Sequence, residues 1–145
     1  MSVLTQPEFL LKVIAMLPGN IYCKDIDGRY IYCNDNVARI LGLKNRHEIV
    51  GKTNDDLLDE ELSQESNRHD KMVMEQGKEL TFEETGLDEN SNRVVYLTKQ
   101  MPMLDGCKRV IGLLGLSIDI TKRKEIERAK SEFIQNISHD LRTPL

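Results

Sequence analysis

The chain has 145 residues, of which 39% are hydrophobic and 30% charged, and this composition is typical of a globular protein rather than a disordered one. Its net charge of −4 argues against a nucleic-acid partner, and no apolar run approaches the roughly 20 residues that span a bilayer. We therefore expect a cytoplasmic protein, with membrane attachment only through segments outside this chain. The three cysteines form no CxxC pair, so we expect no metal site.

The first third of the chain predicts a helix followed by a β-hairpin. Apolar side chains recur at helical spacing over residues 5–17, and Pro18-Gly19 ends the pattern. Strands are expected at 20–25 and 29–34, joined by a turn that contains Gly28. Pairing Tyr22 with Tyr32 would place four side chains on one apolar, inward face: Ile21, Cys23, Ile31 and Cys33.

The remaining pattern predicts helices and then three strands. A short helix should follow the capping cluster Asn34-Asp35-Asn36, and a longer helix should cover residues 62–76 with Leu62, Met72 and Val73 inward. Strands are expected at 79–87, 93–104 and 109–120. This order predicts an α+β fold with a five-stranded antiparallel sheet and short helices on one face. From Lys122 onward there is no Gly or Pro before Pro144, which predicts one helix leaving the domain.

The last thirteen residues carry the candidate chemistry. On a helix they place five apolar side chains on one stripe: Phe133, Ile134, Ile137, Leu141 and Leu145. His139 falls nearly opposite the centre of that stripe. A neutral imidazole is a nucleophile at cytosolic pH, and phosphoryl transfer needs positioning more than covalent help. The pattern therefore predicts that His139 lies on an outer helix face that a separate domain can reach.

The string SEFIQNISHDLRTPL resembles the H-box of histidine kinases. The resemblance implies that His139 is autophosphorylated from ATP, that Asp140 assists as a base or orienting group, and that Thr143 positions a water for phosphatase activity. It also implies phosphoryl transfer to an aspartate in the receiver domain of a response regulator. Because the chain has no GxGxxG or GxxxxGK[ST] motif, ATP and Mg²⁺ would be used by a catalytic domain outside it, and we expect this fragment to be inactive alone.

Residues 18–121 resemble a PAS domain. The resemblance is carried by LPGNIYCKDIDGRYIYCNDNVARILG, by VMEQGK, and by GLLGLSIDIT followed by KRKEIE. A PAS domain directly before an H-box is similar to the hybrid sensor kinases of the aerobic-respiration-control type. The expected division is an N-terminal helix at 1–17, a PAS sensor domain at 18–121, a signalling helix at 122–132, and the start of a dimerisation and phosphoacceptor helix at 133–145.

These resemblances imply the sensing module of a two-component sensor histidine kinase. A signal, or a rearrangement of a homodimer, would control autophosphorylation of His139. Ile126, Ala129 and Phe133 recur at a/d spacing, which fits a two-fold helical dimer. The alternative is a PAS dimerisation or ligand-binding module with no role in phosphotransfer.

The sequence leaves the sensed signal open, and we expect no cofactor in the chain. His69 lies in the helix where haem-binding PAS domains carry an iron ligand, but its polar neighbours favour a solvated face, so we do not expect haem. Residues 45–56 contain no cysteine for flavin photochemistry. Cys23 and Cys33 on a shared inward face could form a redox switch, although a buried cysteine more often acts as a small hydrophobic residue. A small apolar or carboxylate ligand in the sheet pocket, or no ligand, remains an alternative.

Overall fold

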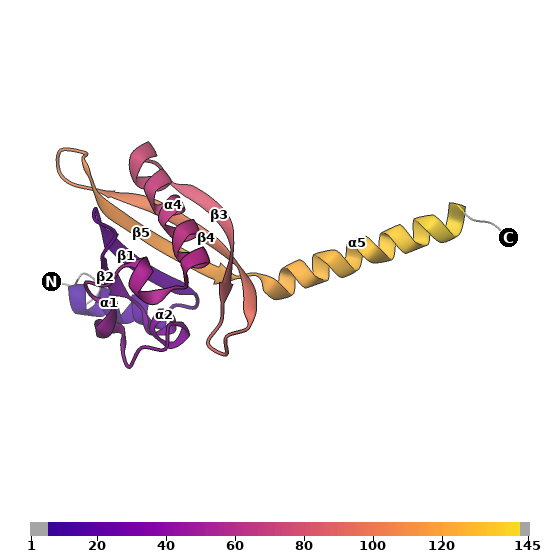
Figure 1. Ribbon diagram of the computed structural model, residues 1–145, viewed down its shortest axis with the longest axis horizontal. Coiled ribbons are helices and arrows are strands. Elements are labelled where there is room, and N and C mark those ends of the chain that lie inside the picture. Colours follow the sequence, from indigo (N-terminus) through magenta and orange to yellow (C-terminus); the bar gives the residue numbers. More distant parts are fainter. Residues whose placement is uncertain (1–5, 143–145) are drawn as a thin grey trace.

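The computed structural model describes residues 6–142, which form one antiparallel sheet with helices on one face and a long helix that projects away (Figure 1). The strand order is β2-β1-β5-β4-β3. The predicted α+β class with five antiparallel strands is confirmed. The elements in chain order are α1 (Pro7–Met16), β1 (Asn20–Asp25), β2 (Tyr30–Cys33), α2 (Asp35–Ile40), the 3-10 helix η2 (Arg46–Ile49), α3 (Asn54–Leu57), α4 (Glu60–Gln76), β3 (Leu80–Leu87), β4 (Arg93–Leu104), β5 (Val110–Asp119) and α5 (Thr121–Arg142).

β5 lies at the centre of the sheet, where it pairs with both β1 and β4. Leu113 on this strand is fully buried. Gly115 lies opposite Tyr22 of β1, and a Cβ atom at this glycine would come within 2.2 Å of the tyrosine ring. The glycine therefore lets the Tyr22 ring lie flat across β5 on the face that the helices cover.

The predicted pairing of the first hairpin is wrong. Tyr22 pairs with Cys33 and Cys23 pairs with Tyr32, and the register shifts between Cys23 and Lys24. Because neighbouring residues of a strand point to opposite faces, Tyr22 and Cys33 share one face while Cys23 lies on the other. The inward face therefore carries Tyr22, Lys24, Tyr30 and Cys33, so that of the four side chains that we expected there only Cys33 is present.

Helix α4 covers the inner face of the sheet, and its ends are capped as its sequence suggests. The Asp59 side chain accepts a hydrogen bond from the backbone N–H of Leu62, and Gly77 ends the helix with a positive φ of 63°. The helix starts two residues earlier than predicted. Its buried residues are Ser63, His69, Asp70 and Val73. Of the three side chains predicted to face inward, Val73 is buried, while Leu62 and Met72 are only half-buried.

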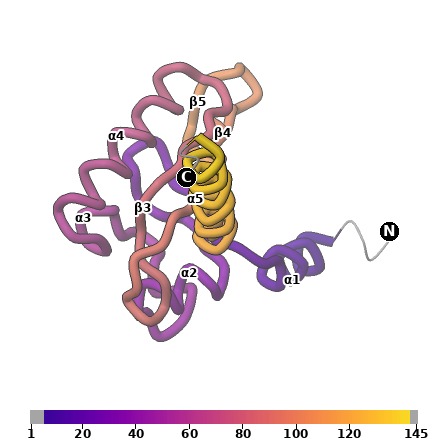
Figure 2. Tube along the Cα trace, turned by 90° about the vertical axis from the view of Figure 1, so that its right-hand side faces the viewer, coloured from indigo at the N-terminus to yellow at the C-terminus, as the bar shows by residue number. Residues whose placement is uncertain are grey.

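Helix α5 continues the chain directly after β5 and runs without interruption to Arg142. Its first residue is tied to the sheet, because the backbone N–H of Val95 donates to Thr121 Oγ1 at 2.8 Å. No residue of α5 is buried. Figure 2, seen along α5, shows α1 and α4 on opposite sides of this helix. None of the helices within residues 6–142 could span a lipid bilayer.

Candidate functional site

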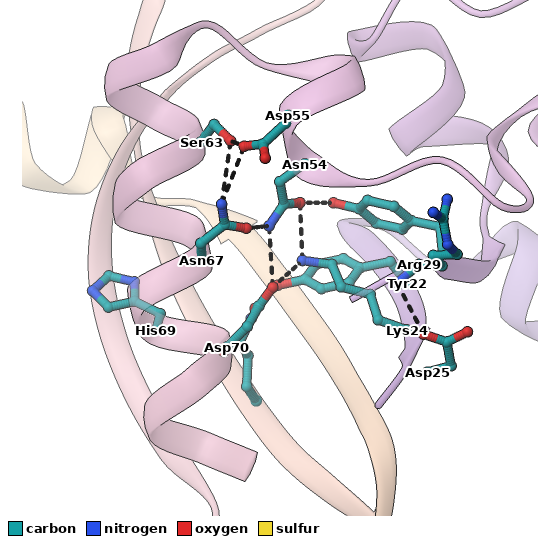
Figure 3. Close-up of polar contacts among 12 residues, drawn as sticks. Tyr22, Lys24, Asp25, Arg29, Asn54, Asp55, Ser63, Asn67, His69 and Asp70 are labelled. Carbon is teal, nitrogen blue, oxygen red and sulfur yellow. Dashed lines mark hydrogen bonds and ion pairs between the residues drawn. The ribbon is translucent and has the colours of Figure 1, made fainter. Parts of the chain in front are cut away.

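A lysine lies at the centre of the inner face. The Lys24 side chain is 0% exposed, and its Nζ lies 2.5 Å from Asp70 Oδ2 and 3.0 Å from Asn54 Oδ1 (Figure 3). The three residues come from β1, α4 and α3. Removing two charges from water is costly, and their attraction compensates only where further hydrogen bonds complete the geometry. The surrounding side chains provide these bonds.

Asn54 connects the Lys24–Asp70 ion pair to the buried Tyr30 of β2. Its Oδ1 accepts a hydrogen bond from the Tyr30 hydroxyl at 2.7 Å, and its Nδ2 donates to Asp70 Oδ2 at 3.1 Å. The remaining oxygen of Asp70 accepts from Gln100 Nε2 at 2.9 Å, and the same amide donates to the Tyr22 hydroxyl at 2.8 Å. One polar network therefore joins β1, β2, α3, α4 and β4.

The electrostatics of this network keep its tyrosines neutral. Lys24 Nζ lies 4.7 Å from the ring centroid of Tyr30 and 5.1 Å from that of Tyr22, within the range of cation–π attraction. Burial raises the pKa of both hydroxyls far above the ordinary value of 10.0. Both hydroxyls therefore remain protonated at any physiological pH.

A cavity of about 350 Å³ adjoins the network between the sheet and helices α2 to α4. This volume lies in the range of small-molecule sites. Tyr22 and Tyr30 form part of its wall, together with apolar side chains from the helices and polar side chains from the sheet. Its charged lining residues are Asp59 and Glu84, and no Lys or Arg of residues 6–142 lines it. The lining therefore favours a neutral or cationic small molecule over a carboxylate.

His69 is 5% exposed, so the prediction of a solvated face for this part of α4 is wrong. Strand β3 covers it: the imidazole stacks on Phe82 with 3.8 Å between ring centroids, and His69 Nδ1 lies 3.2 Å from Glu84 Oε2. In Figure 3 the ring points away from the network around Lys24. That haem does not bind at His69 stays a prediction.

The two hairpin cysteines do not share one inward face, contrary to our expectation. They lie on opposite faces of the sheet, and both are free thiols. Burial raises the pKa of Cys33 to about 11 and also raises the pKa of Cys23 above its ordinary value. Because the thiolate is the reactive form, these shifts make both side chains poor nucleophiles. The geometry therefore gives no support to a Cys23–Cys33 redox switch.

His139 lies far along α5, away from the cavity. Its side chain is 77% exposed, and its Nδ1 is 3.9 Å from Asp140 Oδ1. The apolar stripe of this helix is also exposed at Phe133, Ile134, Ile137 and Leu141. Thr143, the third predicted member of the site, lies outside the described residues. The roles predicted for these side chains stay predictions.

The network of Lys24, Asn54, Asp70 and Gln100 was not predicted from the sequence. Alternation in β1 was the available signal, because Lys24 is two residues from Tyr22 and must share its face. Alternation alone does not predict a buried lysine, because lysine is almost never fully buried without a partner. Here the partner, Asp70, is 46 residues further along the chain.

Comparison with known proteins gives matches over nearly the whole chain. A family model described as PAS fold matches residues 15–125. The aerobic respiration control sensor protein ArcB of Escherichia coli strain K12 is 28% identical over 147 aligned positions, which cover 97% of this chain and 19% of that protein. Sensor protein kinase WalK of Staphylococcus aureus is 30% identical over 140 positions, covering 92% of this chain and 30% of that protein. The chain thus spans less than a third of either relative.

A solved structure shares the fold. The crystal structure of the PAS domain of a protein from Colwellia psychrerythraea superposes with a TM-score of 0.65 at 18% identity, covering 79% of this chain and 97% of that one. Identity at this level demonstrates a common architecture only.

Proposed function

Because the chain belongs to the PAS family, we propose that it is the sensory and phosphoacceptor segment of a two-component sensor histidine kinase. The observation that carries the proposal is the unbroken helix α5, which connects the last strand of the domain to His139. The distant similarity to two sensor kinases supports the same assignment. In this proposal the cavity receives the signal and α5 conveys it.

The proposed chemistry uses His139 as the acceptor. One imidazole nitrogen attacks the γ-phosphorus of ATP, the bond from that phosphorus to the bridging oxygen breaks, and ADP leaves from a catalytic domain outside this chain. We assign the attack to Nε2, because Nδ1 is the nitrogen that faces Asp140. Asp140 then orients the ring or accepts its proton. The phosphoryl group passes on to an aspartate of a receiver domain, and Thr143 positions the water that removes it in the phosphatase reaction.

We propose that the kinase acts as a homodimer through α5. A stripe of apolar side chains on this helix is exposed in the single chain, and an exposed stripe of this spacing is suited to packing against a second helix. The stripe comprises Ile126, Phe133, Ile134, Ile137 and Leu141. The opposite side carries His139, where a catalytic or receiver domain has access.

A second candidate function is ligand binding with dimerisation but without phosphotransfer. The cavity of about 350 Å³ favours this candidate, because a ligand can bind in the domain whether or not His139 accepts a phosphoryl group. The two candidates differ only in the role of His139.

Trans-phosphorylation tests the assignment. The protein is mixed with a histidine-kinase ATP-binding domain and labelled ATP, and acid-labile, base-stable phosphate is measured. We expect label in the wild type and none in His139→Gln. His47→Gln is the matched control, since His47 is an exposed histidine of η2, and it should be labelled like the wild type. A folded wild-type dimer that takes no label would contradict the phosphoacceptor role and leave the second candidate.

A further inference from the structure

Three side chains with metal-ligating atoms meet between α4 and β3, away from the network around Lys24. They are Glu65, His69 and Glu84, and one ligand atom of each lies within 4.8 Å of the others. Glu65 and His69 are four residues apart on α4, so they project from the same helix face one turn apart. Glu84 reaches them from the facing strand. Two consecutive elements of the chain, α4 and β3, thus present one cluster.

The imidazole of the cluster is held in a fixed orientation. His69 is 5% exposed, and its ring is nearly parallel to that of Phe82, with an interplanar angle of 10°. Its Nδ1 lies 3.2 Å from Glu84 Oε2. Neighbouring ligands of a tetrahedral ion are separated by roughly 3.4 Å, because metal–nitrogen and metal–oxygen bonds are about 2.0–2.2 Å. An ion could therefore be shared by these two atoms with little movement of either side chain.

The charge balance of the cluster favours a cation. Neither Glu65 nor Glu84 pairs with a Lys or Arg side chain anywhere in residues 6–142. Both carboxylates are only partly exposed, so solvent screens their mutual repulsion incompletely. A divalent ion would compensate both charges and would bind the neutral form of His69.

We propose that Glu65, His69 and Glu84 bind one divalent transition-metal ion. The mixed imidazole and carboxylate donors suit ions such as Zn²⁺ or Co²⁺ better than Ca²⁺ or Mg²⁺, which prefer oxygen ligands throughout. Glu84 also lines the cavity, whereas Glu65 and His69 do not. The bound ion joins α4 to β3. Binding does not depend on the phosphotransfer role of His139.

Titration of tag-free, chelator-treated protein tests the site. Zn²⁺ binding is followed by calorimetry, Co²⁺ binding by visible absorption, and the thermal midpoint of unfolding is measured with and without ion. We expect one ion per chain, a raised midpoint, and a Co²⁺ spectrum typical of nitrogen and oxygen ligands. Glu65→Gln, His69→Gln and Glu84→Gln should each weaken Zn²⁺ binding by more than about tenfold, as expected for lost ligands.

Variants outside the cluster, and a cluster variant that keeps its fold, serve as controls. Glu61→Gln and His47→Gln change exposed side chains outside the cluster and should bind like the wild type. His69→Gln alters a buried position and could unfold, but Glu65 is partly exposed, so Glu65→Gln should retain the wild-type circular dichroism spectrum. The proposal is overturned if the wild type shows no stoichiometric Zn²⁺ binding, or if Glu65→Gln binds as tightly as the wild type. A Co²⁺ spectrum with thiolate charge-transfer bands would also overturn it, because the ion would then be on a cysteine.

Discussion

Glu83 of β3 and Lys124 of α5 form an ion pair across the junction between sheet and helix, with 2.8 Å between Oε1 and Nζ. The carboxylate raises the pKa of Lys124 above its ordinary value, chiefly through this hydrogen bond. The next residue, Glu84, points to the other face of the strand and contacts His69. Neighbouring side chains of β3 therefore contact the buried His69 of α4 on one face and the first turn of α5 on the other.

Lys124→Gln should loosen the first turn of α5 while changing global stability little. The ion pair is half-exposed and on the surface, where such pairs stabilise weakly and are screened by salt. Amide hydrogen exchange of residues 122–126 should be faster in the variant, and the difference should shrink at high salt. Lys122→Gln, which alters an exposed lysine outside any ion pair of residues 6–142, is the control. Equal exchange in the two variants would contradict a role for the Glu83 contact.

Asp70→Asn should destabilise the domain by about 3–5 kcal/mol, because it leaves the buried Lys24 without its counter-charge. Urea unfolding measures the difference. Asp27→Asn, at an exposed turn position, should be nearly neutral. The double variant Lys24→Met/Asp70→Leu should recover much of the loss, since a buried ion pair replaced by apolar side chains is often tolerated. If Asp70→Asn were as stable as the wild type, the Lys24–Asp70 ion pair would not stabilise the domain.

Gly115→Ala should cost about 1–3 kcal/mol, the usual range for inserting an atom into a packed region. The new Cβ would meet the Tyr22 ring at 2.2 Å, and the ring is fixed by its hydrogen bond from Gln100. Gly106→Ala is the matched control, because a Cβ there meets nothing within 4 Å. Thermal or urea unfolding distinguishes them. Similar stability for both variants would mean that Tyr22 can move aside at little cost.

Asp105 should contribute to the pH dependence of stability. The backbone N–H of Arg109 holds the pKa of this carboxyl below its ordinary value of 3.8, with help from the N–H of Cys107. A folded-state pKa below the unfolded value stabilises the fold above the unfolded pKa, and this contribution is lost as pH falls through the folded pKa. Asp105→Asn should therefore be less stable than the wild type at pH 7. The difference in stability between Asp105→Asn and the wild type should vanish in strong acid. Denaturant unfolding at a series of pH values measures it. A difference that stays constant with pH would contradict a contribution from the ionised Asp105 carboxylate.

The strands and the long helices could be predicted because their signals are local. Alternation, the turn around Gly28 and the capping cluster Asn34-Asp35-Asn36 act within a few residues, and each appears in the structure close to its predicted place. The register of the first hairpin was not predictable in this way, since the pairing passes from Cys23–Tyr32 to Lys24–Tyr30 and leaves Ile31 of β2 as an extra residue. The partner that allows Lys24 to be buried comes from α4. The burial of His69 likewise depends on β3, which packs over α4 only in the folded chain.

The anchoring of α5 at Thr121 makes the helix a lever. Its fulcrum is the first turn, where the Val95 N–H donates to Thr121 Oγ1 and Lys124 pairs with Glu83. Beyond this turn, no residue of the helix up to Arg142 is buried. From Thr121 to His139 a straight helix rises roughly 27 Å, so a tilt of about 5° at the fulcrum would move the imidazole by about 2 Å. A displacement at the sheet end of α5 that is too small to alter the packing of the sheet would thus produce a larger displacement of His139.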